Sequence, residues 1–532
     1  MTPGMDSVPA TSRASLWKRL ASTSTWDVVV IGGGATGLGV ALDAAARGYA
    51  VALIERDDFA KGTSSRATKL VHGGVRYLAQ GHLGLVREAL RERARLLRNA
   101  PHLAQPLPFL LPLRGGPGRI LDRWKYGLGL GLYDALAGSD RIGRTTALGH
   151  RPALQQVPGL RPDGLAGALR FVDGQFDDAR LALALARTAI HRGASVLNHC
   201  AAVALSHDEA GRVTGVIAED RETGAQTRLA SRCVVNATGV WVDAVRRWDD
   251  AAASPLVSPS QGVHLVVDHR FLGGDHAVLV PRTEDGRVMF ATPWLGHAIL
   301  GTTDTPRSDL PTEPEALSAE VDFILREAGR QLVIAPTRAD VRSVWVGLRP
   351  LVRAAQGSDT KRLSREHAIE VSQSGLVTVT GGKWTTYRAM AEAVLARCIE
   401  HGLIGGRPAG VTASLRLAGA PERCHHALSA PPGLHLYGTE ADRVRSLPGH
   451  DRELAPGLTE AMVRFAAREE MARSVEDVLA RRSRWLFLDA ARAAALAPRV
   501  AELLSEELGP RFDAAASQRA FADLARQFAT PP

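Results

Sequence analysis

The stretch DVVVIGGGATG, residues 27–37, decides the fold, because it joins a buried strand to a glycine-rich turn. Its β-branched run at 27–31 has the length of a strand buried on both faces. The Ala-rich segment at 38–47 is typical of a helix, and AVALI at 50–54 is typical of a second apolar strand. Together these pieces predict a βαβ unit of about 30 residues.

Three glycines of this unit have the spacing of a dinucleotide-binding turn, G-x-G-x-x-G. Gly32 permits the tight turn, Gly34 lets a pyrophosphate approach the backbone, and Gly37 lets the helix pack closely on the strand. Glu55 follows about 20 residues later, where an acidic side chain accepts hydrogen bonds from a ribose hydroxyl. The pattern therefore predicts an unphosphorylated dinucleotide, either FAD or NAD.

Two later segments favour FAD, because a nicotinamide enzyme usually needs only one such unit. VVNATG at 234–239 and TGGKWTT at 380–386 both read as strand ends that open onto small residues. The polar loop at 57–77 is too long for a simple connector and is expected to wrap the ribityl and pyrophosphate groups. The expected flavin contacts in these three segments are Ser64, Ser65, Gly74, Ala237, Gly239, Gly382, Thr385 and Thr386, although Thr385 could equally be an ordinary helix cap.

Composition excludes several classes of protein. With 532 residues, 45% of them hydrophobic and 23% charged, the chain is neither disordered nor fibrous. The net charge of +9 is compatible with nucleic acid, anionic lipid or an anionic small substrate as a partner. The four cysteines form no C-x-x-C pair, so no metal site is predicted. No run approaches the roughly 18 apolar residues that span a bilayer, and the N-terminus lacks a secretory signal.

The order of patterns along the chain predicts an α/β fold with additions. Residues 1–24 are expected to form a flexible extension, and the proline-rich tract at 101–117 is expected to break regular structure. Short β-rich segments between about 250 and 340 predict an inserted antiparallel sheet. A Pro/Gly-rich linker follows residue 406, and helical periodicity from residue 458 onward predicts a C-terminal helical cap.

Nine motifs, in order and spacing, closely resemble the FAD-dependent glycerol-3-phosphate dehydrogenases of the aerobic, respiratory type. The resemblance is strong over about residues 26–400 and weaker over the helical tail. The motifs are DVVVIGGGATG, SSRATKLVHGGVRYL, FDDARL, VNATGVWV, QGVHLVV, GTTD, WVGLRPL, LSREH and GGKWTTYR.

The resemblance implies a glutathione-reductase-like FAD-binding Rossmann domain with an inserted substrate domain and a C-terminal cap. The FAD-dependent oxidoreductase region would span 25–405 and the cap 406–532. Within the former, a discontinuous FAD domain would take about 25–115, 165–245 and 340–405, and the substrate domain mainly 250–340.

The resemblance also implies an activity: oxidation of sn-glycerol 3-phosphate to dihydroxyacetone phosphate by hydride transfer to flavin N5. Electrons would pass to a membrane quinone, and the protein would be cytoplasmic, peripheral on the inner face of the cell membrane. It leaves a homodimer open. Residues 114–133 interleave basic with apolar side chains, which suits either an interfacial segment or packing on the substrate domain.

The resemblance places six side chains in the substrate pocket, five of which can carry positive charge against a phosphate dianion. Guanidinium and ammonium groups are the usual partners of phosphate oxygens. His264 is the candidate base for the C2 hydroxyl proton, because an imidazole can be neutral near pH 7. Lys383 or Arg349 would stabilise the developing alkoxide. The six residues are Arg76, Tyr77, His264, Arg349, Arg365 and Lys383.

Three other functions stay open at this point. A soluble glycerol-3-phosphate oxidase would share every motif and differ only in passing electrons to oxygen. An amine or amino-acid oxidase of the same flavin superfamily would recognise a single carboxylate, for which the expected set of cations is excessive. An FAD-containing nucleic-acid-binding protein would need aromatics interleaved with the basic residues, whereas aromatics make up only 5% of the chain, so nucleic acid is not expected as a partner.

Overall fold

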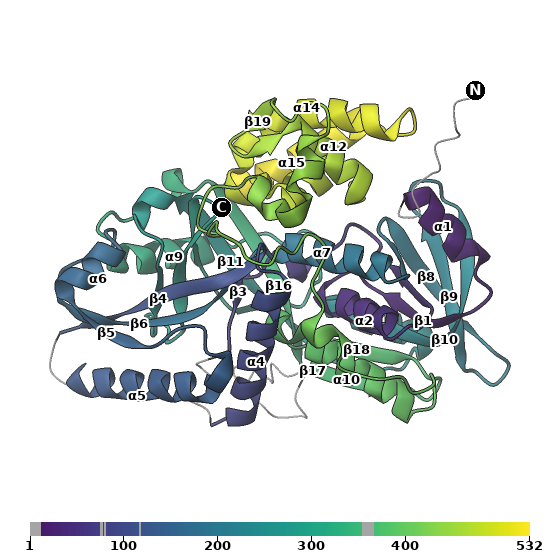
Figure 1. The fold of residues 1–532 in the computed structure, drawn as a ribbon, viewed down its shortest axis with the longest axis horizontal. Coiled ribbons are helices and arrows are strands. Elements are labelled where there is room, and N and C mark those ends of the chain that lie inside the picture. Colours follow the sequence, from purple (N-terminus) through teal and green to yellow (C-terminus); the bar gives the residue numbers. More distant parts are fainter. Residues whose placement is uncertain (1–11, 75–77, 79–80, 116–118, 354–366) are drawn as a thin grey trace.

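Two mixed sheets lie side by side, and a helical cap sits above their junction (Figure 1). The computed structural model describes residues 12–74, 78, 81–115, 119–353 and 367–532, and of residues 119–123 only the backbone. None of the described helices combines the length and apolarity that a membrane crossing requires.

The first sheet contains the predicted βαβ unit. Its strand order is β17-β18-β10-β1-β2-β7, and β1 pairs in parallel with both β10 and β2. Helix α2 packs on α10 and α7, and β8 and β9 extend β10 as an antiparallel meander. The bounds are β1 Trp26–Ile31, α2 Ala35–Ala46, β2 Val51–Ile54, α7 Asp178–His191, β7 Ser195–Leu197, β8 Cys200–His207, β9 Val213–Asp220, β10 Gln226–Asn236, α8 Val242–Asp249, β17 His367–Val371, β18 Val377–Gly381 and α10 Tyr387–Glu400.

The second sheet uses more of the chain than the range 250–340 that the sequence predicts. Its order is β15-β11-β14-β13-β12-β4-β6-β3, with β16 paired to β11 and β5 to β6. Strands β3 to β6 come from the segment between β2 and β7 of the first sheet, so sequence position alone does not assign them. The bounds are β3 Leu70–Val71, β4 Ala104–Arg114, β5 Thr146–Gly149, β6 Leu165–Phe176, β11 Val257–Asp268, β12 Ala277–Val280, β13 Met289–Trp294, β14 His297–Gly301, β15 Thr305–Pro306 and β16 Ser343–Val352.

Two local expectations differ from the structure. The proline-rich tract is strand β4, which pairs along its whole length with β6. On its other side, β4 pairs with β12 only at Phe109 and Leu110, which lie between Pro108 and Pro112. Proline has no N–H to donate to a neighbouring strand, so the prolines limit the length of this pairing. Residues 13–22 of the expected flexible extension form helix α1 (Arg13–Ser22), which buries Leu16 and Leu20; residues 1–11 lie outside the described part.

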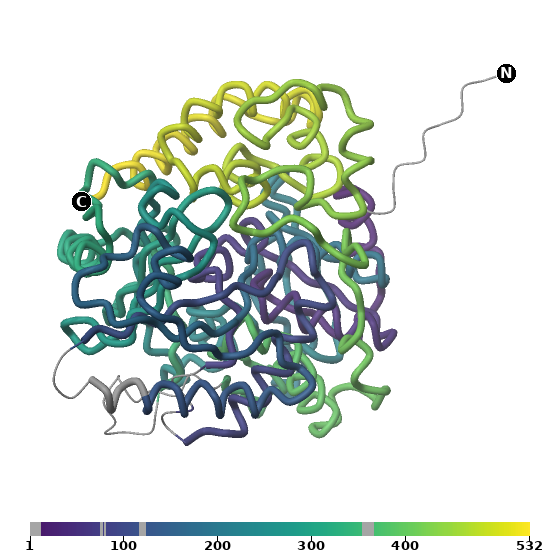
Figure 2. Tube along the Cα trace, turned by 60° about the vertical axis from the view of Figure 1, so that its left-hand side comes forward, coloured from purple at the N-terminus to yellow at the C-terminus, as the bar shows by residue number. Residues whose placement is uncertain are grey.

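The C-terminal helical cap that the sequence predicts is present in the structure. Its core is continuous with the second sheet, since Trp294 and Trp345 of that sheet pack among the cap's buried side chains. Figure 2 shows the cap as one yellow-green layer over the rest of the chain. The cap elements are α11 Ala441–Arg445, β19 Glu453–Ala455, β20 Leu458–Thr459, α12 Glu460–Glu469, the π-helix η10 Asp477–Arg482, α13 Trp485–Leu488, α14 Ala490–Leu508 and α15 Ala514–Ala529. The other helices are α4 Leu83–Asn99, α5 Arg119–Ala137, α6 His150–Gln156 and α9 Ser318–Gln331.

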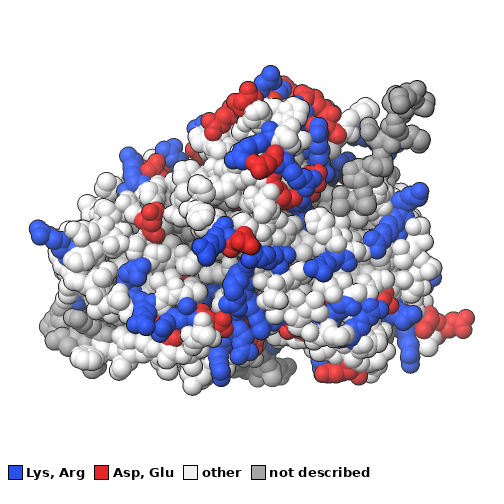
Figure 3. All heavy atoms as spheres, in the orientation of Figure 1, with Lys and Arg blue, Asp and Glu red and all other residues white. Residues whose placement is uncertain are grey.

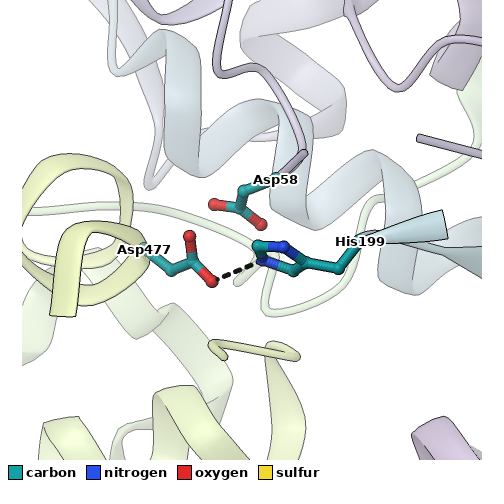
Figure 4. Close-up of side chains that lie close together, drawn as sticks. All are labelled: Asp58, His199 and Asp477. Atoms are coloured by element: carbon teal, nitrogen blue, oxygen red, sulfur yellow. Dashed lines mark hydrogen bonds and ion pairs between the residues drawn. The ribbon is translucent and has the colours of Figure 1, made fainter. Parts of the chain in front are cut away.

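A buried ion-pair cluster fastens the cap to the first sheet. Asp58, His199 and Asp477 lie close enough together to hold a metal ion (Figure 4). However, both Arg481 and Arg482 donate to the Asp58 carboxylate, and Arg481 also donates to Asp477 at 2.8 Å. Two guanidinium groups already neutralise the carboxylates, so the cluster is a salt-bridge network across the domain junction.

This network predicts a pH-dependent stability. Burial lowers the pKa of His199, but the Asp477 carboxylate 2.9 Å away raises it more, with Asp58 adding to and Arg13 opposing that effect, so the net pKa is raised. The stabilisation is therefore full below the pKa of the unfolded chain and is lost as pH rises through the raised folded pKa. We expect His199→Gln to flatten this part of the profile of thermal midpoint against pH. An unchanged profile would show that the His199–Asp477 pair does not contribute to the pH dependence of stability.

Candidate functional site

One cavity of about 1770 Å³ lies between the two sheets. It opens at the carboxyl ends of β1, β2, β10 and β18, which is where ligands bind in open α/β sheets. Most of the residues predicted from the sequence line it: Gly32, Gly34, Glu55, Ser64, Gly74, Ala237, Gly239, His264, Arg349, Gly382, Lys383, Thr385 and Thr386.

The glycine turn is shaped by contacts that exclude side chains. Gly32 has φ +110°, and a Cβ there would lie 2.7 Å from the Ala237 carbonyl oxygen. A Cβ on Gly37 would lie 2.0 Å from the Gly32 carbonyl oxygen, so this glycine lies behind the turn rather than in the cavity wall. Helix α2 begins at this turn, and the Ala35 N–H donates to Ser64 Oγ at 2.9 Å. Gly34, Ala35 and Thr36 line the cavity, so the N-terminus of the helix, with its positive dipole, faces it.

Glu55 closes the other side of the turn. Its carboxylate accepts the N–H of Gly33 at 2.6 Å and the N–H of Asp57 at 2.8 Å. Burial raises the pKa of Glu55, while these two hydrogen bonds act against the rise. A carboxylate oxygen can accept more than one hydrogen bond, so Glu55 keeps acceptor capacity for a ribose hydroxyl.

These features fit FAD. The cavity is larger than the 300–1,000 Å³ typical of a site for one small ligand, so it has room for a dinucleotide and a second molecule. Its dinucleotide end has a glycine cradle, a helix N-terminus and an acidic side chain.

Arg349 lies at the other end of the cavity, on β16. Its Nη1 donates to Asp304 Oδ1 and to the Gln261 carbonyl oxygen, both at 3.1 Å. Its Nη2 donates to Thr302 Oγ1 at 3.0 Å and to the Thr303 carbonyl oxygen at 2.9 Å. These four bonds hold the guanidinium in one orientation at the cavity wall.

His264 lies on β11, directly opposite Trp345 on β16. Its Nε2 lies 2.9 Å from Thr68 Oγ1, and its ring stacks on the Trp345 indole with 4.2 Å between centroids. Burial, followed by the positive charges of Arg349 and Lys69, lowers the pKa of His264 well below its ordinary value. The imidazole is therefore neutral near pH 7, the form that accepts a proton.

The segment that follows β18 ties the cavity loops together. Lys383 precedes the short 3₁₀ turn Trp384–Thr386 that leads into α10. Trp384 Nε1 donates to the Ser64 carbonyl oxygen at 2.9 Å, and Thr385 Oγ1 accepts the His72 N–H at 3.1 Å. Thr385 therefore fixes the loop at 72–74, a role that neither sequence interpretation included.

Ser65 is a predicted flavin contact that does not line the cavity. Its side chain is buried, and its carbonyl oxygen accepts bonds from Lys69 and Arg484. Arg76, Tyr77 and Arg365 lie outside the described residues.

The sequence prediction also missed residues that support the site. Thr68 and Trp345 contact His264, and Lys69 packs on the Trp345 ring, although SSRATKLVHGGVRYL and WVGLRPL contain all three. The sequence offered one signal for them: each stands in a motif that also contains a predicted ligand contact. Nothing in the sequence itself pairs residue 69 with residue 345.

Comparison with known proteins gives a consistent result. Residues 27–396 match the FAD dependent oxidoreductase family, and residues 400–514 match the C-terminal domain of alpha-glycerophosphate oxidase. A probable mitochondrial glycerol-3-phosphate dehydrogenase of Caenorhabditis elegans is 40% identical, over 97% of this chain and 75% of its own length. The human mitochondrial glycerol-3-phosphate dehydrogenase is 38% identical, over 93% of this chain and 72% of its own length.

Solved structures agree. The Bacillus halodurans glycerol-3-phosphate dehydrogenase, complexed with FAD, superposes with a TM-score of 0.79 at 30% identity over 98% of both chains. L-alpha-glycerophosphate oxidase from Mycoplasma pneumoniae is 16% identical with a TM-score of 0.57, over 74% of this chain and 99% of its own, and shows a likeness of fold alone. The resemblance found in the motifs is thus confirmed, and the chain belongs to the family of FAD-dependent glycerol-3-phosphate dehydrogenases.

Proposed function

We propose that this protein uses FAD to oxidise sn-glycerol 3-phosphate to dihydroxyacetone phosphate. The observation that carries the proposal is that one cavity joins the dinucleotide turn to His264, Arg349 and Lys383. A neutral imidazole and two cationic side chains suit a substrate with an alcohol to deprotonate and a phosphate to bind.

In this proposal each side chain has one task. Arg349, whose orientation four hydrogen bonds fix, binds substrate oxygens together with Lys383. His264 takes the proton from the C2 hydroxyl. Bound FAD supplies the acceptor for the two electrons that leave C2. The walls of the cavity orient the substrate, which is the protein's main contribution in a cofactor enzyme.

The direct test is anaerobic addition of sn-glycerol 3-phosphate to the purified holoenzyme. We expect the flavin absorbance to bleach, and glycerol 1-phosphate of the opposite configuration to leave it unchanged. A flavin that stays oxidised with both compounds would refute the substrate assignment. Reoxidation with a short-chain quinone and with oxygen then separates a dehydrogenase from an oxidase, because each acceptor restores the absorbance at its own rate.

We further propose that the electron acceptor is a membrane quinone and that the protein binds the inner face of the cell membrane through helix α5. Trp124, Leu128 and Leu132 are exposed at intervals of four residues along α5, which places them on one face. Leu128 and Leu132 also line the mouth of the cavity that contains His264, together with other residues of α5 and α4. Basic side chains gather over neighbouring α4, where Arg87 and Arg91 are exposed (Figure 3). Such a surface suits anionic lipid and an apolar acceptor.

Flotation with liposomes that contain anionic lipid tests this surface. We expect the unaltered protein to float at low salt and the double variant Trp124→Ser/Leu128→Ser to stay at the bottom. Ile334→Ser is the matched control, because Ile334 is also an exposed apolar residue but lies beyond helix α9. Equal flotation of the double variant and the unaltered protein would exclude α5 as the contact.

Glu55→Gln gives a separate prediction about the cofactor. The amide keeps one acceptor oxygen but loses the charge that strengthens the bonds from Gly33 and Asp57 and the contact expected with the ribose. A loss of about 1–2 kcal/mol corresponds to roughly 5- to 30-fold weaker FAD binding. Titration of apoprotein with FAD, followed by flavin fluorescence, measures the change. Unchanged affinity would show that Glu55 shapes the turn without contributing to binding.

A further inference from the structure

The C-terminal cap reaches the back of the wall that carries His264. Trp345 stacks on His264 with an angle of 19° between the ring planes, and both side chains are buried. Phe487 of α13 packs edge-on against Trp345 with 5.4 Å between the centroids. Ser343 Oγ donates to the Leu486 carbonyl oxygen at 2.9 Å, which anchors α13 to the start of β16. A continuous stack of rings therefore links the cap to the imidazole.

Lys69 fills the space beside this stack. Its Nζ lies 4.5 Å from the Trp345 ring centroid, 5.2 Å from that of Trp294 and 5.3 Å from that of Phe487. It donates to Asp178 at 2.7 Å, and its side chain is fully buried. Rings and carboxylate together fix this ammonium and, through it, the indole.

Arg484 of the cap binds the same acceptors from the other side. Its Nη2 donates to Asp178 Oδ1 at 2.9 Å and to the Ser65 carbonyl oxygen at 3.0 Å. The loop at 65–69 is thereby held between the cap and α7. Thr68 of this loop contacts the edge of the His264 ring, so the cap fixes the ring by a second route.

The backbone at this contact is strained. Lys69 has φ +63° and Arg484 has φ +68°, in the left-handed region that residues with a Cβ rarely adopt. Leu295, next to Trp294, has φ +46°. Such residues persist where the surroundings hold them and concentrate at functional sites. The strain here lies on both sides of the contact between cap and loop.

We propose that the C-terminal cap is a positioning element of the catalytic centre. Phe487 holds Trp345 from behind, and Trp345 holds the face of the His264 ring. Arg484 holds the 65–69 loop, and Thr68 holds the edge of the ring. The inference rests on the proposed function, because the position of the ring matters only if His264 takes part in the reaction.

Phe487→Leu in the full-length holoenzyme tests the proposal. We expect FAD reduction by sn-glycerol 3-phosphate to slow about 30- to 100-fold, since a misplacement near 1 Å has an effect of that size. The substrate concentration that gives half the maximal rate should stay within about threefold, because the groups that bind substrate are untouched. The pH profile of the reduction rate should shift as well, because water that enters beside His264 reverses part of the burial that lowers its pKa, while the charges of Arg349 and Lys69, which also lower it, stay in place.

A readout independent of activity is the ring itself. Histidine labelled at Cε1 reports the protonation of His264 by NMR, with the resonance assigned by its loss in His264→Gln. We expect this resonance to titrate at higher pH in Phe487→Leu than in the unaltered protein. Phe521→Leu is the matched control, because it removes the same atoms from the cap core in α15. Its reduction rate should stay within about twofold of the unaltered rate.

The outcomes are distinct. A normal rate, pH profile and titration in Phe487→Leu would overturn the inference, and so would equal slowing in Phe521→Leu, because general loosening of the cap would then suffice. If Phe487→Leu does not fold, Phe487→Met replaces the ring by an unbranched, flexible side chain that adapts to an irregular space in the core, and the same changes are expected. Failure of the unaltered holoenzyme to reduce FAD would instead refute the proposed function.

Discussion

His264→Gln is expected to slow the reduction of FAD by sn-glycerol 3-phosphate by about 10²- to 10⁴-fold, the usual contribution of a positioned general base. Glutamine retains polar atoms near Thr68 but cannot accept the proton of an alcohol near pH 7. In the unaltered enzyme the pKa of His264 is lowered well below its ordinary value, so the basic form persists throughout the neutral range. Protonation of the imidazole should therefore lower the rate only in acid, and a change of rate near pH 7 would instead report Lys69, whose pKa burial lowers to about 7.

Stopped-flow absorbance of the flavin under anaerobic conditions measures this rate. Thr68→Val is the companion variant, since it removes only the partner of Nε2 and should slow reduction about tenfold or less. FAD content should match the unaltered protein in both variants, because neither residue contacts the glycine turn. A rate for His264→Gln within a few-fold of normal would place the base elsewhere, with Lys383 the next candidate.

Asp178→Ala is expected to have the largest effect on stability. Asp178 is fully buried and accepts bonds from Lys69 at 2.7 Å, Ala67 N–H at 3.0 Å and Arg484 at 2.9 Å. Its removal takes a carboxylate from buried Arg484 and from Lys69, whose pKa burial already lowers to about 7, and breaking a buried pair typically costs about 3–5 kcal/mol. We expect a large fall in the midpoint of urea unfolding followed by tryptophan fluorescence.

An exposed ion pair is the control that shows how much of the stability effect of Asp178 is due to its burial. Asp523 pairs with Arg526 on the surface of α15, and Asp523→Ala should change stability by about 0–1 kcal/mol at most. Asp178→Asn keeps the shape and loses the charge, so its midpoint should lie between those of Asp178→Ala and the unaltered protein. An Asp178→Ala midpoint equal to that of Asp523→Ala would show that the bonds to Asp178 do not contribute to stability.

The dinucleotide end of the site could be predicted because local backbone geometry requires its residues. Gly32 is needed for its positive φ and Gly37 for close packing, and both requirements appear in the sequence as spacing. His264 and Arg349 were predicted through resemblance, and the structure places them on neighbouring strands at the same cavity. Their roles as base and anchor stay predictions.

What the sequence could not provide is long-range pairing. Asp178 lies 109 positions from Lys69 and 306 from Arg484, and no local pattern indicates that the three meet. FDDARL was a recognisable motif, yet its second aspartate gave no sign that it anchors the cap. The strand at 104–114 was missed for the opposite reason: its prolines give a strong local signal, which pairing with β6 overrides.

The order of strands in the first sheet has a consequence for synthesis on the ribosome. β1 pairs with β2 soon after both emerge, but its other neighbour β10 follows roughly 200 residues later. At 5–20 residues per second this is a delay of about 10–40 s. During that time the edge of an apolar strand, WDVVVI, lacks its partner, and such edges pair readily with other chains. Overproduction in a foreign host should therefore yield more native protein when translation is slowed or chaperones that bind extended apolar segments are supplied.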